Sequence, residues 1–381
     1  MAIPSSPPEE GERGRVAELI RRLAGMAGPD GFVPFDRFME LALYGKGVGF
    51  YAREPSPFGP EGDYYTAAHV HPLFGRALAE RVRGVRRALS GVERFRVAEV
   101  GPGDGTLAAS VLAALGRAPE GVAGLEYVVV ERSAPLALRA MERIERAGRS
   151  VGVSVRHATS LGSDGPFDGM VLANELLDAQ PARRLRWDGR AWRELGVCVA
   201  GDRLESAESV LVAPVPFPEL PAPAEEGVVL EVSPPAEALM REVADHLVRG
   251  LAVFLDYGME EPELLAAHPR GTLARVRQHQ TFDDPLEDPG TSDLSVFVNF
   301  SRVRAAARRA GLKEVTYTSQ SEALGRWGFA ELLQEALGAA GSAEAEVRLR
   351  LQAKNLLFGF ERFRVLELAT PASETALATP T

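Results

Sequence analysis

The chain has 381 residues, of which 45% are hydrophobic and 25% are charged, as in an ordinary globular protein. Its length exceeds what one hydrophobic core usually supports, so we expect one large domain with additions, or two domains. A formal net charge of −10 argues against nucleic acid as a partner, because binding phosphates requires a basic face. One cysteine, Cys198, excludes an intrachain disulfide framework and argues against a thiolate metal site.

Hydropathy and the amino-terminal composition predict a protein without a membrane segment. No run approaches the eighteen apolar residues that a spanning helix needs. The first stretch, MAIPSSPPEEGERGR, is acidic and rich in proline, unlike a signal or transit peptide. We therefore expect a cytoplasmic protein that does not act at a membrane.

The first predicted elements are helices. Residues 11–26 have an amphipathic pattern, with Val16, Leu19 and Leu23 on one side. A second helix is expected in PFDRFMELALYG, where Asp36 could cap the start and Gly45 ends the pattern.

The next stretch, EGDYYTAAHVHPLFG, places two of the six histidines, His69 and His71, one residue apart. On an extended segment both imidazoles would share one face. This pattern fits a metal pair, a catalytic base beside a substrate, or two ordinary surface histidines. The function of the rest of the chain has to decide among them.

From residue 96 onward, strands and helices alternate. The predicted strands are continuous apolar runs, which is typical of a parallel sheet covered on both faces. They lie at residues 96–101, 125–131, 153–159, 167–175 and 250–258, with helices at 106–116, 134–148 and 235–250. The fold class predicted is therefore α/β, with a Rossmann-like, mostly parallel sheet and helices on both faces.

Two interruptions indicate insertions into this pattern. Residues 183–195 read as a β-hairpin turned at Asp188-Gly189, followed by a proline-rich connector at 212–227. Residues 279–295 form a long polar loop, and such loops are usually functional. We expect a helical amino-terminal region with a site-bordering loop, a core with inserted caps, and a disordered tail. The expected bounds are 1–90 for the first, 91–365 for the core with caps at about 182–228 and 260–300, and 366–381 for the tail.

The stretch VAEVGPGDGTLAASVLAAL has a strand, a glycine loop and a helix in the order that a nucleotide-type cofactor requires. Its glycines, Gly101, Gly103 and Gly105, depart from the dinucleotide fingerprint, and Thr106 takes the final position. Glu99 would repel a pyrophosphate but could pair with an α-amino group. This pattern favours S-adenosylmethionine, which carries an amino acid moiety and no phosphate, over a nicotinamide cofactor.

Acidic and amide residues follow two further strands. Glu131 ends the strand at 125–131, where it could accept both ribose hydroxyls, or could simply be a charge at a helix start. Asn174, Glu175 and Asp178 follow the strand at 167–175 and would face the reacting methyl group, although Asp178 could instead cap a helix. Together with the glycine loop, these residues predict methyl transfer.

At this point the chain resembles the MidA-like methyltransferases, the family that contains a mitochondrial complex I assembly factor that methylates an arginine. The resemblance covers roughly residues 32–329. It rests on FMELALYGKGVGFY, GDYYT, PLFG, EVGPGDGTL, ANELLDAQP, EVSPPA, DYG, DPLEDPGTSDL and GLKEVTYTSQSEAL. The resemblance implies a class I methyltransferase sheet, an added α/β cap over the active site and S-adenosyl-L-methionine as methyl donor.

The resemblance also assigns residues. The glycine loop and Glu131 carry over as cofactor contacts, and Asn174, Glu175 and Asp178 as the motif after the fourth strand. Three residues of an early loop, Gly62, Asp63 and Thr66, are expected to border the cofactor. Tyr65 could line the acceptor pocket or seal the cofactor.

Two departures from the family pattern concern the methyl acceptor. His69 and Asn299 stand where the family usually has carboxylates. A guanidinium is best held by carboxylates, whereas a histidine can take a proton from a hydroxyl that attacks a methyl group. We therefore favour an oxygen of a small or carrier-bound metabolite as acceptor, with His69 as general base and Glu175 or Asp178 orienting it, and Asn299 binding substrate.

Two alternatives stay open. The first is a protein arginine N-methyltransferase that relies on the remaining carboxylates, and the second is a non-enzymatic assembly protein that retains the fold. Apolar surface in the added segments could form a homodimer. Methyl transfer in this fold needs no metal, so no metal site is expected.

Overall fold

The computed structural model describes residues 10–52, 66–215, 220–221, 225–277, 280–282 and 284–377. The chain folds into two compact units. The core unit holds Tyr65–Leu176, Met240–Tyr257 and Ala307–Thr381, and the accessory unit holds Met1–Tyr64, Leu177–Leu239 and Gly258–Ala306. Within the described ranges, no helix has the length and apolar character needed to cross a membrane.

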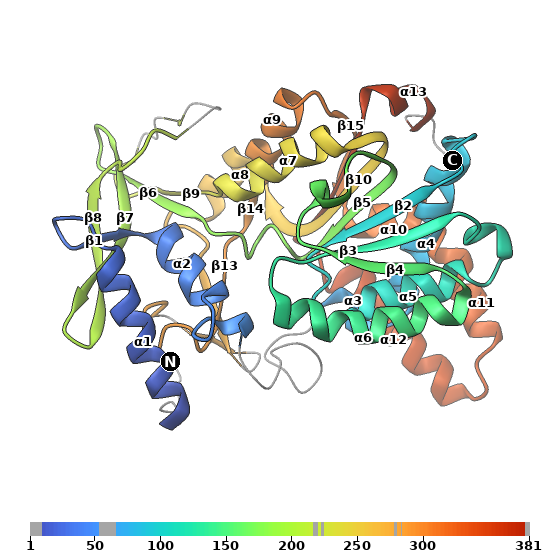
Figure 1. The fold of residues 1–381 in the computed structure, drawn as a ribbon, viewed down its shortest axis with the longest axis horizontal. Coiled ribbons are helices and arrows are strands. Elements are labelled where there is room, and N and C mark those ends of the chain that lie inside the picture. Colours follow the sequence, from blue (N-terminus) through green and yellow to red (C-terminus); the bar gives the residue numbers. More distant parts are fainter. Residues whose placement is uncertain are drawn as a thin grey trace. The chain divides into compact units, whose positions relative to one another are not determined.

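Seven strands of an eight-stranded sheet form the centre of the core unit, in the order β15-β16-β10-β5-β2-β3-β4 (Figure 1). The eighth strand, β14 (Val298–Asn299), pairs with the end of β10 at Gly258 and Met259. The seven central strands are β2 (Phe95–Val100), β3 (Leu125–Val130), β4 (Ser154–Ala158), β5 (Phe167–Asn174), β10 (Leu247–Met259), β15 (Lys313–Ser319) and β16 (Phe363–Ala369). Strands β4, β3, β2, β5 and β10 are parallel, whereas β16 runs antiparallel to both of its neighbours. The predicted α/β class with a mostly parallel sheet is confirmed.

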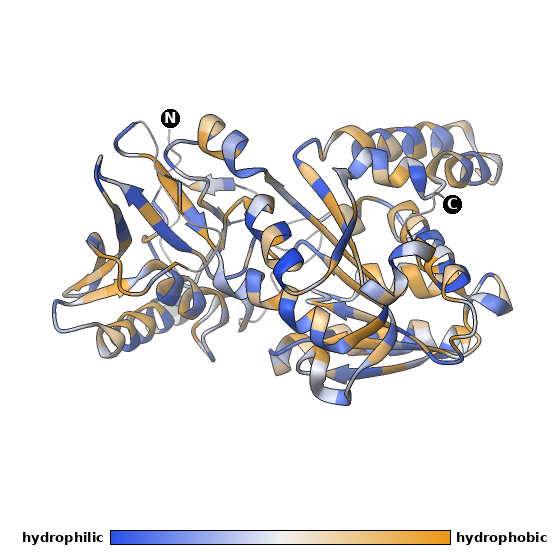
Figure 2. Ribbon diagram, turned by 90° about the horizontal axis from the view of Figure 1, so that it is seen from above, coloured by the Kyte–Doolittle hydropathy of each residue, from blue (hydrophilic) through white to orange (hydrophobic). Residues whose placement is uncertain are grey.

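Helices connect and cover these strands. They are α3 (Ala67–Val70), α4 (Leu73–Ala88), α5 (Thr106–Leu115), α6 (Ala134–Val151), α7 (Pro234–His246), α10 (Gln320–Arg326), α11 (Phe329–Gly338), α12 (Ala343–Phe358) and α13 (Glu374–Leu377), of which α7 begins in the accessory unit. One large apolar cluster joins the sheet to its helices, with Phe74 of α4, Val111 of α5 and Val129 of β3 among its members. Figure 2 shows hydrophobic residues concentrated along the strands, while many helices carry both polar and apolar faces. The burial of continuous apolar strands is what holds this unit together.

A close approach between β2 and β5 requires glycine at position 169. Gly169 has φ 150°, and a Cβ built there would lie 1.9 Å from the carbonyl oxygen of Arg96 on β2. The two strands are hydrogen-bonded in parallel through this point, so neither backbone can retreat without breaking the ladder.

The accessory unit contains two small sheets. The larger has the order β1-β7-β6-β9 with β8 on β7, and the smaller has the order β12-β11-β13. Their strands are β1 (Phe32–Pro34), β6 (Arg183–Trp187), β7 (Trp192–Ala200), β8 (Arg203–Val210), β9 (Val229–Val232), β11 (Ala274–Arg277), β12 (Gln280–Phe282) and β13 (Asp293–Ser295). The remaining elements are α1 (Glu10–Met26), α2 (Phe35–Tyr44), α8 (Glu261–Ala267), β14 (Val298–Asn299), α9 (Phe300–Arg309), whose last residues belong to the core unit, and short 3-10 turns.

The predicted hairpin is present as β6 and β7. Asp188 closes its turn, since its amide donates to Ala191 O at 3.0 Å and its carboxylate accepts from the amides of Arg190 and Ala191. Trp187 and Trp192 pack edge to face with ring centroids 5.6 Å apart, so these two residues contribute packing.

Three expectations about organisation need correction. The first boundary lies between residues 64 and 65, not at 90, because α4 packs on α5 and α11 of the core unit. The accessory unit takes in residues 177–239 and 258–306, which extend beyond the caps expected at 182–228 and 260–300. The polar loop at 279–295 contains strands β12 and β13.

The disordered tail expected at 366–381 is wrong for residues 366–377. Strand β16 continues to Ala369, paired with β10 and β15. Beyond it Ser373 and Leu377 are buried, the latter at the end of α13. The alanine- and threonine-rich composition of this segment concealed a strand that is buried on both faces.

We predict that Gly169→Ala lowers the free energy of unfolding by about 2 kcal/mol or more, because the added methyl group must displace the β2 backbone. The matched control is Gly325→Ala in α10, where a Cβ meets nothing within 4 Å. That change should be neutral or stabilise by about 0.5 kcal/mol. Urea unfolding of both variants measures the difference, and equal stabilities would contradict the close-approach argument.

Candidate functional site

The glycine loop between β2 and α5 needs glycine for both conformation and space. Gly101, Gly103 and Gly105 have φ values of 67°, 57° and 79°, in the left-handed region that side chains disfavour. A Cβ at Gly101 would lie 2.7 Å from Leu176 Cδ1, and one at Gly105 would lie 2.8 Å from Ile144 Cγ1. At its three glycines the loop therefore exposes backbone that a ligand at the start of α5 can approach closely.

Asp104, within this loop, gathers four donors. Its Oδ1 accepts from the Thr106 amide at 3.0 Å, and its Oδ2 accepts from Thr106 Oγ1 at 3.0 Å and from Arg143 Nη1 at 2.6 Å. His69 Nε2 lies 3.4 Å from the same Oδ2. Burial alone would raise the pKa of Asp104, but the hydrogen bonds from His69 and Thr106 outweigh it and hold that pKa well below its usual range.

His69 ties the start of α3 to the glycine loop. Its Nδ1 lies 3.3 Å from the Thr66 amide, which donates to it, and 2.9 Å from Thr66 Oγ1. An Nδ1 that accepts leaves the ring proton on Nε2, which then donates to Asp104. Both ring nitrogens are thus engaged, and the side chain is only 8% exposed. His71 is separate from this network, since its Nδ1 accepts from the Leu73 amide at 3.1 Å.

Two buried carboxyl groups end the neighbouring strands β2 and β3. Glu99 is 2% exposed and accepts a hydrogen bond of 2.6 Å from Tyr127 Oη. Burial raises the pKa of Glu99 to about 7, even though the bond from Tyr127 acts in the opposite direction. Glu131 accepts from the Ser133 amide at 2.7 Å, and burial raises its pKa as well. A cationic or hydroxyl-bearing ligand would therefore meet acceptors that water does not reach.

The turn after β5 is strained. Glu175 has φ 51°, a conformation that costs a residue with a side chain about 1–3 kcal/mol. Its Oε1 accepts from the Ala67 amide and from Asn174 Nδ2, each at 3.2 Å. Such strain persists only where the surroundings over-determine it, and it is commonest at functional sites.

Asn174 points to a ligand at this edge. Its Oδ1 is buried and has no hydrogen-bond partner among the described residues, although its Nδ2 is bonded to Glu175. An orphaned buried acceptor costs free energy unless a bound group supplies a donor. In parallel sheets, ligands bind beyond the carboxyl ends of the strands. The carboxyl ends of β2, β3 and β5 lie at one edge of the core unit's sheet. The glycine cradle, the carboxyl groups and this amide therefore fit a ligand with ammonium and hydroxyl donors.

Among the described residues, two of the predicted site residues belong to the accessory unit. Asp178 is buried, and its main-chain carbonyl accepts from the Val296 amide at 3.0 Å. Asn299 caps α9, since its Oδ1 accepts from the Arg302 amide at 3.3 Å, and its Nδ2 donates to Glu261 Oε2 at 2.9 Å.

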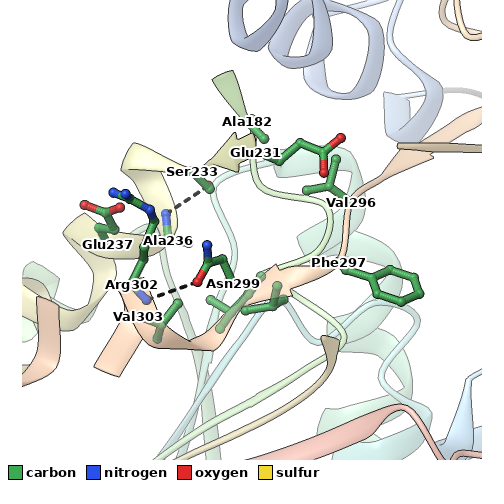
Figure 3. Close-up of a pocket in the computed structure, with 12 residues that line it drawn as sticks. Ala182, Glu231, Ser233, Ala236, Glu237, Val296, Phe297, Asn299, Arg302 and Val303 are labelled. Atoms are coloured by element: carbon green, nitrogen blue, oxygen red, sulfur yellow. Dashed lines mark hydrogen bonds between the residues drawn. The ribbon is translucent and has the colours of Figure 1, made fainter. Parts of the chain in front are cut away.

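Asn299 also lines a small pocket of the accessory unit, beside Arg302, as Figure 3 shows. The other labelled lining residues are Ala182, Glu231, Ser233, Ala236, Glu237, Val296, Phe297 and Val303. The side chain of Asn299 therefore has structural partners within the accessory unit.

The core unit holds most of the predicted site residues, namely Thr66, His69, Glu99, Gly101, Gly103, Gly105, Thr106, Glu131, Asn174 and Glu175. Gly62, Asp63 and Tyr65 lie outside the described residues. The sequence reasoning did not select Asp104, which the geometry makes the centre of the glycine loop. The one feature of the local sequence that could have indicated Asp104 is its position between Gly103 and Gly105.

The raised pKa of Glu99 predicts a pH-dependent stability of the ligand-free protein. Between pH 4.5, the ordinary pKa of a glutamate, and the raised pKa of about 7, the folded state keeps the proton that the unfolded state has lost. The free energy of unfolding should therefore fall as pH rises through this window, by about 3 kcal/mol, and level off above it. Glu99→Gln keeps an acceptor for Tyr127 but cannot ionise, so this part of the slope should vanish. Urea unfolding at pH 5 and pH 8 measures it, and identical slopes in both proteins would contradict the assignment.

Known methyltransferases resemble this chain over most of its length. The model of a family of S-adenosyl-L-methionine-dependent methyltransferases matches residues 73–318. The mitochondrial protein arginine methyltransferase NDUFAF7 homolog of Drosophila melanogaster is 28% identical over 340 residues, which cover 82% of this chain and 75% of the relative. The Mus musculus NDUFAF7 protein is 27% identical over 326 residues, covering 80% and 73%.

A solved structure extends the similarity to nearly the whole chain. It is the crystal structure of a Burkholderia thailandensis protein bound to S-adenosyl-homocysteine, with a TM-score of 0.84 and 30% sequence identity. The alignment covers 96% of this chain and 95% of that one. The cofactor predicted from the glycine loop is thereby confirmed as S-adenosyl-L-methionine. The chain belongs to the MidA-like family of S-adenosyl-L-methionine-dependent methyltransferases.

Proposed function

We propose that this methyltransferase acts on a guanidinium nitrogen of a protein arginine. The observation that carries the proposal is Glu175, a carboxylate held at the carboxyl end of β5 by a left-handed backbone and by two donors to its Oε1. Carboxylates pair with guanidinium groups through two parallel hydrogen bonds, which fix the orientation of the cation. The relatives from Drosophila melanogaster and Mus musculus are named as protein arginine methyltransferases, which supports the same acceptor.

The cofactor side of the site follows from the core unit. When bound, S-adenosyl-L-methionine supplies an electrophilic methyl group on a sulfonium. We assign the ionised form of Glu99 to its α-ammonium, Glu131 to its ribose hydroxyls, and the orphaned Oδ1 of Asn174 to one of its donors. The glycine loop contributes backbone that a ligand can approach closely, and Thr66 and His69 hold the segment next to it.

On the acceptor side, Glu175 holds the guanidinium so that one nitrogen faces the methyl group. Methyl transfer would form a bond from this nitrogen to the methyl carbon while the bond from sulfur to that carbon breaks, and the proton that the nitrogen gives up would pass to water. The carboxylate stabilises the cation before and after transfer, and no strong base is needed. Orientation supplies the rate, because a misplacement of about 1 Å can cost a hundredfold in turnover.

We predict that Glu175→Gln lowers kcat on an arginine substrate by about a hundredfold, since the charged half of the pair is lost while the size is kept. The matched control is Glu242→Gln on α7, a carboxylate that accepts from the Leu161 amide and takes no part in the proposed site. Labelled cofactor, arginine peptides and lysate proteins provide the assay, with mass spectrometry to locate the methyl group. Methylation confined to oxygen, detected by its loss in mild base, would contradict the proposal.

An oxygen acceptor with His69 as general base is the second candidate. It is favoured by the 3.4 Å contact between His69 and Asp104, because a carboxylate that orients an imidazole is the usual arrangement of a catalytic base. Against it, Nδ1 already accepts from Thr66, so this nitrogen would have to change partner to take a proton.

The two roles of His69 predict different behaviour of His69→Gln. If the ring only joins Thr66 to Asp104, the variant should lower kcat/KM a few-fold at every pH and leave the shape of the pH–rate profile unchanged. If it is the base, the acid limb of that profile should disappear along with most of the turnover. We expect the first outcome, and a profile that loses its acid limb would favour the oxygen acceptor.

A further inference from the structure

Asp256, near the end of β10, is a buried carboxylate that the proposed reaction does not use. It is 1% exposed and belongs to the core unit. Carboxylates are rarely buried to this extent unless they hold specific partners. The partners of Asp256 lie on the turn that follows the neighbouring strand.

The carboxylate of Asp256 adds one more hydrogen bond between β5 and β10, just beyond the last backbone hydrogen bond between these strands. The parallel pairing ends with Leu255 opposite Asn174, and the Glu175 amide donates to Leu255 O at 2.8 Å. The next amide, that of Leu176, donates to Asp256 Oδ2 at 3.1 Å. The Tyr257 amide donates to Oδ1 at 2.9 Å, so both carboxylate oxygens are engaged.

These bonds fix the direction in which the chain leaves β5. Glu175 is in the left-handed region, and the amides on both sides of its Cα are bonded to consecutive residues of β10. Leu176 in turn lies against the glycine loop, since a Cβ at Gly101 would approach its Cδ1 to 2.7 Å. One carboxylate therefore sets the position of Glu175 and of a side chain that supports the cofactor loop.

We propose that Asp256 is a positioning residue for methyl transfer, which acts by holding the Leu176 amide and thereby the turn that presents Glu175. This inference rests on the proposed function, because Glu175 is taken as the carboxylate that orients the acceptor. Asp256 itself touches neither acceptor nor cofactor in this role.

The test compares Asp256→Ala and Asp256→Asn with Asp168→Asn. Asp168 and Arg249 form an ion pair between the same two strands at their amino ends, so the control weakens the same strand pair without touching the turn. We expect Asp256→Ala to lower kcat about a hundredfold with a smaller change in KM, and Asp256→Asn, which retains one acceptor oxygen, to recover part of the loss. Asp168→Asn should retain its turnover.

A double-mutant cycle with Glu175→Gln separates positioning from a general loss of stability. If Asp256 acts through Glu175, the double variant Asp256→Asn/Glu175→Gln should lose little more turnover than Glu175→Gln alone. Losses that multiply would overturn the proposal, and so would Asp256→Ala with turnover within twofold of the unaltered protein.

A second measurement does not depend on the acceptor. Hydrogen exchange of the Leu176 amide should accelerate in Asp256→Asn but not in Asp168→Asn, and binding of S-adenosyl-homocysteine, measured by calorimetry, should weaken about threefold in the former. If the unaltered protein fails to methylate arginine substrates, the proposed acceptor fails while these two readings still decide the role of Asp256. Unchanged exchange and unchanged binding would overturn it.

Discussion

The burial of several carboxyl groups along one edge of a parallel sheet is the constraint on which the site depends. Each of these groups needs hydrogen-bond donors to replace water, and the donors come from different parts of the core unit. Asp104 receives four donors and is firmly ionised, whereas Glu99 receives one and has a pKa raised to about 7. The same edge thus holds one fixed charge that organises the protein and one carboxyl that a cationic ligand can ionise.

Much of the core unit could be predicted from the sequence because its signals are local. Continuous apolar runs mark β2, β3 and β5, and the glycines of the loop after β2 mark the turn into α5. The boundary at residues 64 and 65 could not be predicted in this way, because α4 is helical whichever unit it joins. Its assignment depends on packing against α5 and α11, and α11 lies more than two hundred residues away in sequence. Strand β16 was missed for a similar reason, since its partners β10 and β15 are distant or weakly marked.

The site residues differ in the same way, because local sequence signals mark some of them and contacts with distant residues define the others. Glu131 and Glu175 each follow a recognisable strand, so the rule that parallel strands present ligands at their carboxyl ends was enough to select them. Glu99 lies within β2, and its place two residues before Gly101 of the glycine loop marked it. The role of His69 was not accessible, because it depends on Asp104, which is 35 residues away. Asp256 also ends a predicted strand and satisfies the same rule, but its partner Leu176 is 80 residues distant, and only the structure joins them.

The path of the chain explains why so many constraints meet at this edge. The chain crosses between the two units five times, and three of these crossings, after Tyr64, after Leu176 and after Tyr257, meet at this edge of the core unit. Within the core unit these crossings are bonded to one another, since the Ala67 amide donates to Glu175 and the Leu176 amide donates to Asp256. The segments that lead to the accessory unit therefore start from the residues that we assign to the reaction. The turn at Glu175 has a left-handed backbone, and the bond from the next amide to the buried Asp256 fixes that turn within the core unit.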